Sequence, residues 1–321
     1  IIQNNIKFND NYGIHLINSS FNHINRNIVY NNSEGIRFIE SNNNTLLYNL
    51  ISKNKFDGLS LTESFNNNIF RNYIVKNEIS GIFLYRSSYN FIIRNFVINN
   101  SYGIKLKESN INSLSHNFIS KNKFEIIYII GYGGIYLIDS NYNHITRNKI
   151  IGNDLYGIFL RESHYNTIIK NIVINNSYGI ELFDSNNNTI SYNFIYYNKF
   201  TGLILFGSNY NNITRNGVIN NGLCGINLMY SNNNCIYQNK IIKNGESGIY
   251  LDRSYFNFIV RNIIFFNEKY GIFLWNSNNT IIYRNIVYFN RIDDIHIIYG
   301  FPEIFPIELY EKYAIASHFP L

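Results

Sequence analysis

The sequence predicts an all-β solenoid, a rod in which about 12 coils of twenty-two or twenty-three residues stack into parallel sheets. The first reason is a repeat: Gly-Ile or Gly-Leu recurs twelve times at that spacing, with one longer interval of thirty-one. The second is composition, since 61 of 321 residues are asparagine, which is unfavourable inside helices, and only two are alanine. No run of 18 apolar residues exists, so the sequence contains no transmembrane helix.

Each coil follows one pattern when positions are counted from its glycine. A serine lies six places later in all twelve coils, and asparagines lie fourteen and nineteen places later in all twelve. A further asparagine lies nine places later in eleven coils, with Thr280 as the exception. Aliphatic or aromatic residues alternate between these positions. The repeat glycines are Gly13, Gly35, Gly58, Gly81, Gly103, Gly134, Gly157, Gly179, Gly202, Gly225, Gly248 and Gly271.

The spacing of the repeat predicts three short strands in each coil. Apolar residues two apart point to one side of a strand, and the polar residues between these segments are suited to bends. Three bends return the chain to its start one strand spacing higher, so the apolar residues fill the centre of a prism. Twelve coils at about 4.8 Å give a rod on the order of 58 Å long, stabilised by contacts between neighbouring coils.

We expect the repeated asparagines to form ladders, in which each side-chain amide bonds the coils above and below. Asparagine also tolerates left-handed backbone, so we expect such conformations at these residues. The repeat glycine indicates either a positive φ or a close backbone approach. The ladder of middle asparagines is Asn27, Asn49, Asn72, Asn95, Asn117, Asn148, Asn171, Asn193, Asn216, Asn239, Asn262 and Asn285.

The string N-x-I-x-x-N-x-I-x-x-N followed by GI-x-L-x-x-S resembles the right-handed, single-stranded parallel β-helix repeats of the NosD type. These belong to the carbohydrate-binding and sugar-hydrolase (CASH) group, related in fold to pectate lyases. The resemblance covers residues 1 to about 295. It implies an extracytoplasmic location and a carbohydrate or surface role, and NosD itself is associated with copper insertion into a periplasmic reductase.

Two segments depart from the repeat. About eight extra residues fall at 124–133, and we expect a loop folded on the rod, a partner patch or the lip of a groove. Residues 1–295 are expected to form the β-helix and 296–321 an irregular cap, with a short amphipathic helix at 307–316. The chain starts inside a coil, which suggests a mature or truncated product, or an N-terminal end covered by another chain or a second copy.

Outward positions of the predicted strands supply the candidate site. Five places after the glycine, six acidic residues occur in seven consecutive coils, and stacked like charges repel. Aromatic residues two or four positions after the glycine are expected to lie exposed along the same face, where flat rings suit sugar stacking. The candidate carbohydrate-binding residues are Tyr136, Phe159, Phe183, Trp275, Glu108, Asp139, Glu162 and Asp184, and a weak calcium site is considered at Asp139, Glu162 and Asp184. The alternative is a solvated face with local ion pairs.

A basic row lies on a different face, because the position before the middle asparagine is Arg, Lys or His in nine coils. With a formal charge of +6, this row suits an anionic glycan or envelope surface, or else serves solubility. Nucleic acid is not among the partners that we expect.

Three functions follow from these features. The first is a non-catalytic extracellular, cell-surface or periplasmic protein that binds polysaccharide or contributes to an adhesin or envelope assembly. The second is a calcium-assisted polysaccharide lyase or a glycoside hydrolase, which requires a carboxylate cluster or pair. The third is copper maturation of the NosD kind, which the single methionine and two cysteines disfavour. No catalytic residue is assigned, and calcium is the one cofactor considered.

Overall fold

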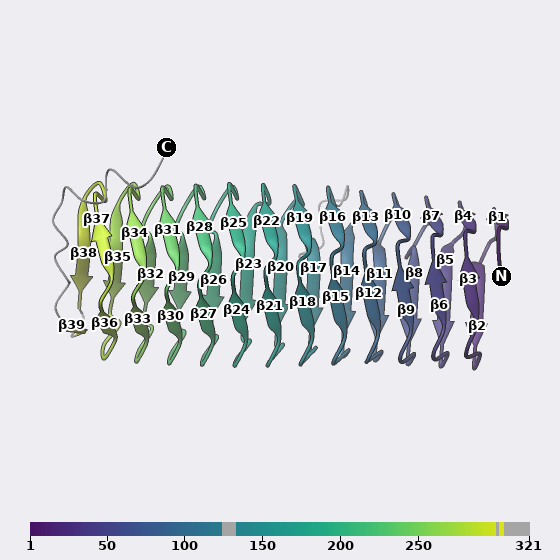
Figure 1. The fold of residues 1–321 in the computed structure, drawn as a ribbon, viewed down its shortest axis with the longest axis horizontal. Helices are drawn as coiled ribbons and strands as arrows, with labels where there is room; N and C mark the ends of the chain where they lie inside the picture. Colours follow the sequence, from purple (N-terminus) through teal and green to yellow (C-terminus); the bar gives the residue numbers. More distant parts are fainter. Residues whose placement is uncertain (124–132, 300–301, 305–321) are drawn as a thin grey trace.

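A computed structural model describes residues 1–123, 133–299 and 302–304 as a rod of stacked coils (Figure 1). Three parallel sheets of 13 strands each run along the rod, and every strand pairs with the strand three places later in the chain. No helix occurs within the described ranges. The predicted all-β parallel β-helix of about 12 coils is therefore confirmed.

The three sheets, which we call C, A and B in the order that each coil visits them, differ in strand length. Sheet C has the longest strands: β2 (Tyr12–Ile17), β5 (Glu34–Ile39), β8 (Leu59–Thr62), β11 (Ser80–Tyr85), β14 (Tyr102–Lys107), β17 (Gly133–Ile138), β20 (Tyr156–Arg161), β23 (Tyr178–Phe183), β26 (Leu203–Phe206), β29 (Ile226–Met229), β32 (Ile249–Asp252), β35 (Tyr270–Trp275) and β38 (Asp293–Ile298).

Strands of sheets A and B are mostly three residues long. Sheet A contains β3 (His23–Asn25), β6 (Thr45–Leu47), β9 (Asn68–Phe70), β12 (Phe91–Ile93), β15 (Ser113–Ser115), β18 (His144–Thr146), β21 (Thr167–Ile169), β24 (Thr189–Ser191), β27 (Asn212–Thr214), β30 (Cys235–Tyr237), β33 (Phe258–Val260), β36 (Ile281–Tyr283) and β39 (Glu303–Ile304). Sheet B contains β1 (Asn5–Lys7), β4 (Ile28–Tyr30), β7 (Leu50–Ser52), β10 (Tyr73–Val75), β13 (Phe96–Ile98), β16 (Phe118–Ser120), β19 (Lys149–Ile151), β22 (Ile172–Ile174), β25 (Phe194–Tyr196), β28 (Gly217–Ile219), β31 (Lys240–Ile242), β34 (Ile263–Phe265) and β37 (Ile286–Tyr288).

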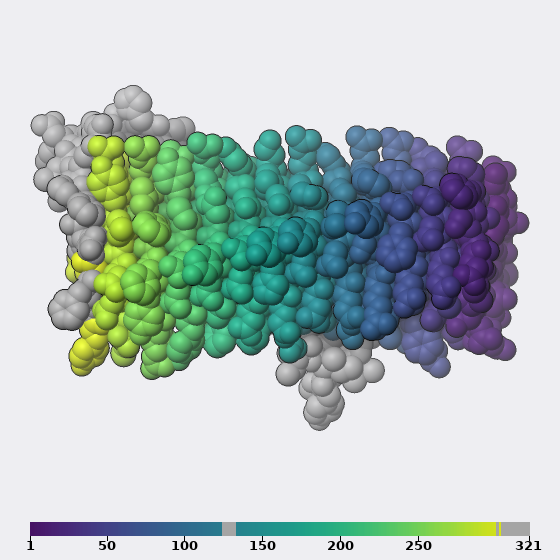
Figure 2. Space-filling view, turned by 90° about the horizontal axis from the view of Figure 1, so that it is seen from below, coloured from purple at the N-terminus to yellow at the C-terminus, as the bar shows by residue number. Residues whose placement is uncertain are grey.

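The core is one continuous column of aliphatic side chains, because each coil turns two residues inward from sheet C and one from each other sheet. In one coil these are Ile158, Leu160, Ile168 and Val173, all fully buried. Burial of each such side chain contributes roughly 1.5–3 kcal/mol. The space-filling view shows the resulting rod as a continuous, gently twisted stack of coils (Figure 2).

The asparagine ladders are present, as predicted. The side-chain oxygen of Asn171 accepts hydrogen bonds from the backbone N–H and the side-chain amide of Asn148, at 2.9 and 3.0 Å. Its own amide donates to Ile145 O at 2.8 Å and to Asn193 Oδ1 at 3.0 Å. Both donors and both lone pairs of this amide are used, so the buried polar corner carries no unmet hydrogen bond there.

Left-handed backbone occurs one residue before each ladder residue, four times per coil. Lys170 has φ 57°, and its N–H donates to Ser191 O at 3.1 Å in the next coil. The expectation that the ladder asparagines themselves are left-handed was wrong. The turn at the preceding residue is what directs the asparagine N–H along the rod. Each left-handed residue costs about 1–2 kcal/mol, which these bonds between coils offset.

The repeat glycines are explained by close approach and not by positive φ. A Cβ on Gly157 would lie 2.4 Å from Val173 Cγ1 and 2.6 Å from Gly179 O. Only Gly152 and Gly207 have positive φ among the glycines of the described ranges. The glycine is therefore required at the inner corner, where each strand of sheet C approaches an inward side chain of sheet B and the carbonyl oxygen of the next repeat glycine.

The coils continue past the boundary expected at residue 295, because β38 pairs with β35 and β39 pairs with β36. Most of the expected insertion (124–132) and the expected helix at 307–316 lie outside the described residues. In the part of the chain that the structure describes, no helix is long and apolar enough to cross a bilayer.

Candidate functional site

The outward surface of sheet C has the richest chemistry in the rod. We define the sheet C face as the positions one place before each repeat glycine and two, four and five places after it. Over twelve coils these positions carry ten Asp or Glu and six Lys or Arg residues. All eight predicted site residues belong to this face, since each lies two, four or five places after a repeat glycine.

The aromatic residues of coils 5–8 stack on one another along the rod. Tyr136 lies 5.4 Å from Tyr102 and 4.7 Å from Phe159, measured between ring centroids. Tyr156 extends the stack, 4.6 Å from Phe159 and 5.6 Å from Tyr178. Tyr136 and Phe159 are only 8% and 7% exposed, so the prediction that they are exposed platforms was wrong. Rings held one strand spacing apart bury each other's faces.

Less buried rings lie further along the face, where Phe183 and Phe206 are half-buried and Tyr230 is exposed. Phe183 stacks on Phe206 at 5.2 Å, and Phe206 lies 5.7 Å from Tyr230. Trp275 is 41% exposed and lies 6.4 Å from Phe273. Phe183 and Trp275 are therefore the two predicted aromatic residues whose placement suits contact with a ligand.

The predicted acidic residues occupy left-handed corners and point into solvent. Glu108 accepts a hydrogen bond from Arg86 Nε at 2.8 Å, and Glu162 accepts one from Arg161 Nε at 3.1 Å. Asp139 and Asp184 are exposed at the same corner position of coils 6 and 8. Within the described ranges, no group of three His, Cys, Asp or Glu side chains is arranged to hold a metal ion. Calcium binding at Asp139, Glu162 and Asp184 stays a prediction.

Glu181 is a site residue that the sequence reasoning did not single out. Its backbone pairs with Phe159 on one side and Ile204 on the other, so its side chain rises within the aromatic stack. Burial there raises the pKa of the carboxyl group to about 7. Burial also raises the pKa of the Tyr156 hydroxyl, and the Glu181 charge adds to that rise. A carboxyl group with a pKa near neutrality is able to accept or donate a proton.

The signal for Glu181 was present, because it is the only acid two places after a repeat glycine in the twelve coils. The spacing places it outward, but it does not reveal that neighbouring rings cover it. Burial depends on side chains from adjacent coils.

A second perturbed carboxyl group lies near the other end of the face. Burial raises the pKa of Asp57 to about 6, although the Ser80 N–H donates to it at 2.8 Å. Nearby, Glu34 pairs with Arg37 at 3.0 Å and accepts a hydrogen bond from Ser60. Five coils, about 24 Å, separate the Asp57 and Glu181 positions. Paired glycosidase carboxyl groups lie roughly 5–10 Å apart, so these two do not form such a pair.

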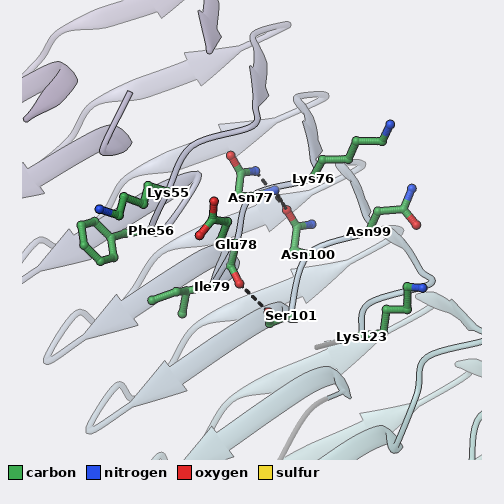
Figure 3. Close-up of a pocket in the computed structure, with 10 residues that line it drawn as sticks. All are labelled: Lys55, Phe56, Lys76, Asn77, Glu78, Ile79, Asn99, Asn100, Ser101 and Lys123. Carbon is green, nitrogen blue, oxygen red and sulfur yellow. Dashed lines mark hydrogen bonds between the residues drawn. The ribbon is translucent and has the colours of Figure 1, made fainter. Parts of the chain in front are cut away.

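A hollow of about 770 Å³ lies at the corner between sheets B and C in coils 2–5 (Figure 3). Lys55, Lys76 and Lys123 line it together with Glu78. The Asn77 amide donates to Asn100 Oδ1 at 3.0 Å beneath these side chains. None of the predicted site residues lines this hollow.

Donors for copper are sparse. Cys224 is buried, and burial raises the pKa of its thiol to about 12, which disfavours the thiolate that binds metal. Cys235 is a separate free cysteine one strand later in the coil, on sheet A. The side chains of the described residues therefore offer no soft ligand cluster for the copper alternative.

Comparison with known proteins places this geometry in a family. A model described as right-handed beta helix region matches residues 92–218 and 177–302, and one described as periplasmic copper-binding protein (NosD) matches residues 1–130. No curated protein sequence matches the chain.

Three solved structures illustrate the likeness in fold. The A-module of the Azotobacter vinelandii mannuronan C-5 epimerase AlgE4 is 14% identical with a TM-score of 0.60, over 88% of each chain. The periplasmic alginate epimerase AlgG is 16% identical with a TM-score of 0.56, over 86% of this chain and 76% of its own. The Dettilon tailspike protein (gp208) is 12% identical with a TM-score of 0.54, over 92% of this chain and 61% of its own. Because the right-handed beta helix model matches well over half of the residues, the chain belongs to the right-handed β-helix family.

Proposed function

We propose that the protein binds a polysaccharide along the sheet C face, in an extracytoplasmic setting and without chemical turnover. The observation that carries this proposal is the row of rings formed by half-buried Phe183 and Phe206, which stack on each other, and exposed Tyr230, which meets Phe206 edge-on; this row continues the buried cluster along the rod. A row of flat rings in line with the rod suits an extended polymer better than a small ligand. The alginate and mannuronan epimerases that share the fold support a glycan partner.

Polar groups beside the rings supply hydrogen bonds for sugar hydroxyl groups. Asp184 and Glu162 are exposed at the corner next to the rings. Arg161, which pairs with Glu162, lies beside Phe183 in the register of sheet C. Charged groups form the stronger hydrogen bonds, and a few of them beside an apolar surface give orientation and specificity.

The test is a glycan array, with and without calcium, followed by affinity measurement on any glycan that binds. The double variant Phe183→Ala with Phe206→Ala is expected to weaken binding roughly tenfold or more, because accessible aromatic residues dominate binding energy. The matched control is Tyr142→Ala with Tyr165→Ala, which removes a ring pair stacked at 5.0 Å on the corner between sheets C and A.

An equal loss of glycan affinity in both double variants would show that the binding surface is not the sheet C face. Absence of any glycan ligand at either calcium concentration would contradict the proposed function.

A polysaccharide lyase or hydrolase is the second candidate, and Glu181 is the observation that favours it. With its pKa raised to about 7, this carboxyl group is able to accept or donate a proton at neutral pH. Ultraviolet absorbance of an unsaturated product, lost in Glu181→Gln, would establish a lyase and contradict the non-catalytic proposal. Binding of a glycan without turnover would exclude lyase or hydrolase activity toward that glycan.

A further inference from the structure

The opposite chemistry occurs on sheet B and the two corners that border it. We define the sheet B side as the positions thirteen, fifteen, seventeen and eighteen places after each repeat glycine. These 48 positions contain no Asp or Glu, although the chain has 21 of them. Over half of the 27 Lys and Arg residues of the chain occur there: Arg26, Lys53, Arg71, Lys76, Arg94, Lys121, Arg147, Lys149, Lys170, Arg215, Lys240, Lys243, Arg261 and Arg284. All of these cations except Lys149 and Lys240 lie in the two corner rows, so cations flank the sheet on both edges.

Between those rows the outward surface of sheet B is apolar. Nineteen of its 24 outward strand positions in the twelve coils are aliphatic or aromatic, whereas only 10 of 24 are so on sheet A. Phe96 and Phe194 are 49% and 50% exposed, and Tyr73 and Ile28 are also exposed. The strip is about 58 Å long and 10 Å wide, roughly 600 Å², which is at the upper end of what a monomer leaves uncovered.

Neutral partners hold several of the flanking cations in place and leave their charge unbalanced. Arg71 donates to the Tyr48 hydroxyl group, and Arg215 donates to Gln238 Oε1 at 2.8 Å. Within the strip itself, the Lys149 ammonium group lies 5.8 Å from the centre of the Phe118 ring. On the sheet C face, in contrast, Arg86 and Arg161 are paired with carboxylates. The positive potential of the sheet B side is therefore not cancelled at these cations.

We propose that the sheet B side docks flat onto an anionic lipid membrane. An apolar strip with Lys and Arg along both edges is the arrangement that places aliphatic and aromatic side chains at the acyl boundary and cations at the headgroups. A second copy of the chain is a poorer occupant, since face-to-face packing would bring two such positive surfaces together. A polysaccharide is also poorer, because Ile and Val side chains offer no hydrogen bond to its hydroxyl groups.

The experiment is co-sedimentation of the full chain with two kinds of vesicle, phosphatidylcholine alone and phosphatidylcholine mixed with phosphatidylglycerol. The protein is expected to sediment with the anionic vesicles, with an affinity that falls as salt is added. It is expected to remain in the supernatant when it is mixed with the zwitterionic vesicles. This readout does not depend on glycan binding, so it fails or succeeds separately from the proposed function.

Two pairs of variants test the surface. Phe96→Ser with Phe194→Ser removes exposed rings from sheet B, and Phe91→Ser with Phe258→Ser removes rings of similar exposure, 44% and 43%, from sheet A. The triple change of Arg71, Arg94 and Arg147 to Gln is matched by the same change at Lys107, Arg161 and Arg253 on the sheet C face. The sheet B variants are expected to bind anionic vesicles at least tenfold more weakly than their matched controls. Circular dichroism confirms that each variant is folded.

Four results would overturn the proposal: no binding to anionic vesicles, equal binding to both kinds of vesicle, equal losses in the two members of a pair, or a dimer in sedimentation analysis that Phe96→Ser with Phe194→Ser dissociates.

Discussion

The sheet C face and the sheet B side are built from the same repeat and present opposite surfaces. Both have parallel strands in register, left-handed corners and ladders of polar side chains. The sheet C face carries ten acids, six cations and stacked rings, whereas the sheet B side carries fourteen cations, no acid and an aliphatic strip. The repeat determines the residue types at the inward and ladder positions, whereas the residues at outward positions are free to vary. The chemistry of each surface is therefore determined by the outward residues at equivalent positions of successive coils.

The net charge of the chain does not reveal the charge difference between the two surfaces. A formal charge of +6 describes a mildly basic protein, yet more than half of the cations and none of the acids lie on one side. Such an uneven distribution gives the rod a preferred orientation near a charged surface.

The largest expected effect comes from the inner corner of the rod, where sheets B and C meet beneath the two surfaces. Gly157→Ala forces a Cβ to within 2.4 Å of Val173 Cγ1 in sheet B and 2.6 Å of Gly179 O in the next strand of sheet C, so this strand has to shift away from both neighbours. We expect a loss of about 3 kcal/mol in the free energy of unfolding, measured by denaturant titration. Gly152→Ala is the control, because nothing lies within 4 Å of its Cβ position and its φ of +62° costs only about 1 kcal/mol. Similar losses in the two variants would show that backbone conformation, and not close approach, requires the repeat glycine.

The second prediction compares the corners that border the two regions. Asn171→Ala, next to sheet B, removes an amide that makes four hydrogen bonds and leaves buried groups of Asn148 and Ile145 unpaired. Ser163→Ala, at the corner next to sheet C, removes a hydroxyl group that accepts from Ser140 N at 3.0 Å and donates to Arg161 O at 2.8 Å. We expect losses of about 2–3 kcal/mol and about 1 kcal/mol in unfolding free energy. A larger loss for Ser163→Ala than for Asn171→Ala would contradict this prediction.

The third prediction uses pH, since the sheet C face carries ten acids and the sheet B side carries none. The pKa of Glu181 is about 7 in the folded protein against an ordinary value of 4.5, so the native state binds more protons between these values. Its contribution to stability is therefore greatest below pH 4.5 and falls as pH rises to 7, by about 2 kcal/mol after allowance for partial exposure.

Glu181→Gln is expected to remove this slope and to raise the melting temperature above neutral pH. Asp184→Asn, an exposed carboxylate in the same coil, is the control and should leave the slope in place. A slope that persists in Glu181→Gln would assign the titration to another group, with Asp57 the next to test.

The smallest effect is expected from a surface ion pair of the sheet C face. Arg86→Ala removes the contacts with Glu108 at 2.8 Å and Glu63 at 3.8 Å, but all three side chains are solvated. We expect a change below about 0.5 kcal/mol in unfolding free energy. A larger loss would mean that charges on this face maintain the fold as well as offer contacts to a ligand.

The sequence predicted the fold and the ladders because both depend on periodic inward and corner positions. It placed the left-handed turns one residue too late, since spacing alone does not show which of two adjacent residues turns the chain. It named Phe183 and Trp275, which are accessible, but also Tyr136 and Phe159, which neighbouring rings bury. Glu181 was missed for the same reason. Burial on an outward face depends on which side chains the adjacent coils happen to carry, whereas core positions are buried in every coil because the repeat places an aliphatic side chain above and below each of them.

The one-coil offset of every ladder bond has a further consequence. Each of these bonds links a residue to its equivalent one period later. The length of both surfaces is therefore proportional to the number of coils. Removing one whole period, such as residues 157–178, would shorten each surface by one strand spacing, about 4.8 Å, while leaving the remaining bonds in register. Gain or loss of coils in the gene is thus a way to match the rod to the dimension of whatever it touches, without redesign of any contact.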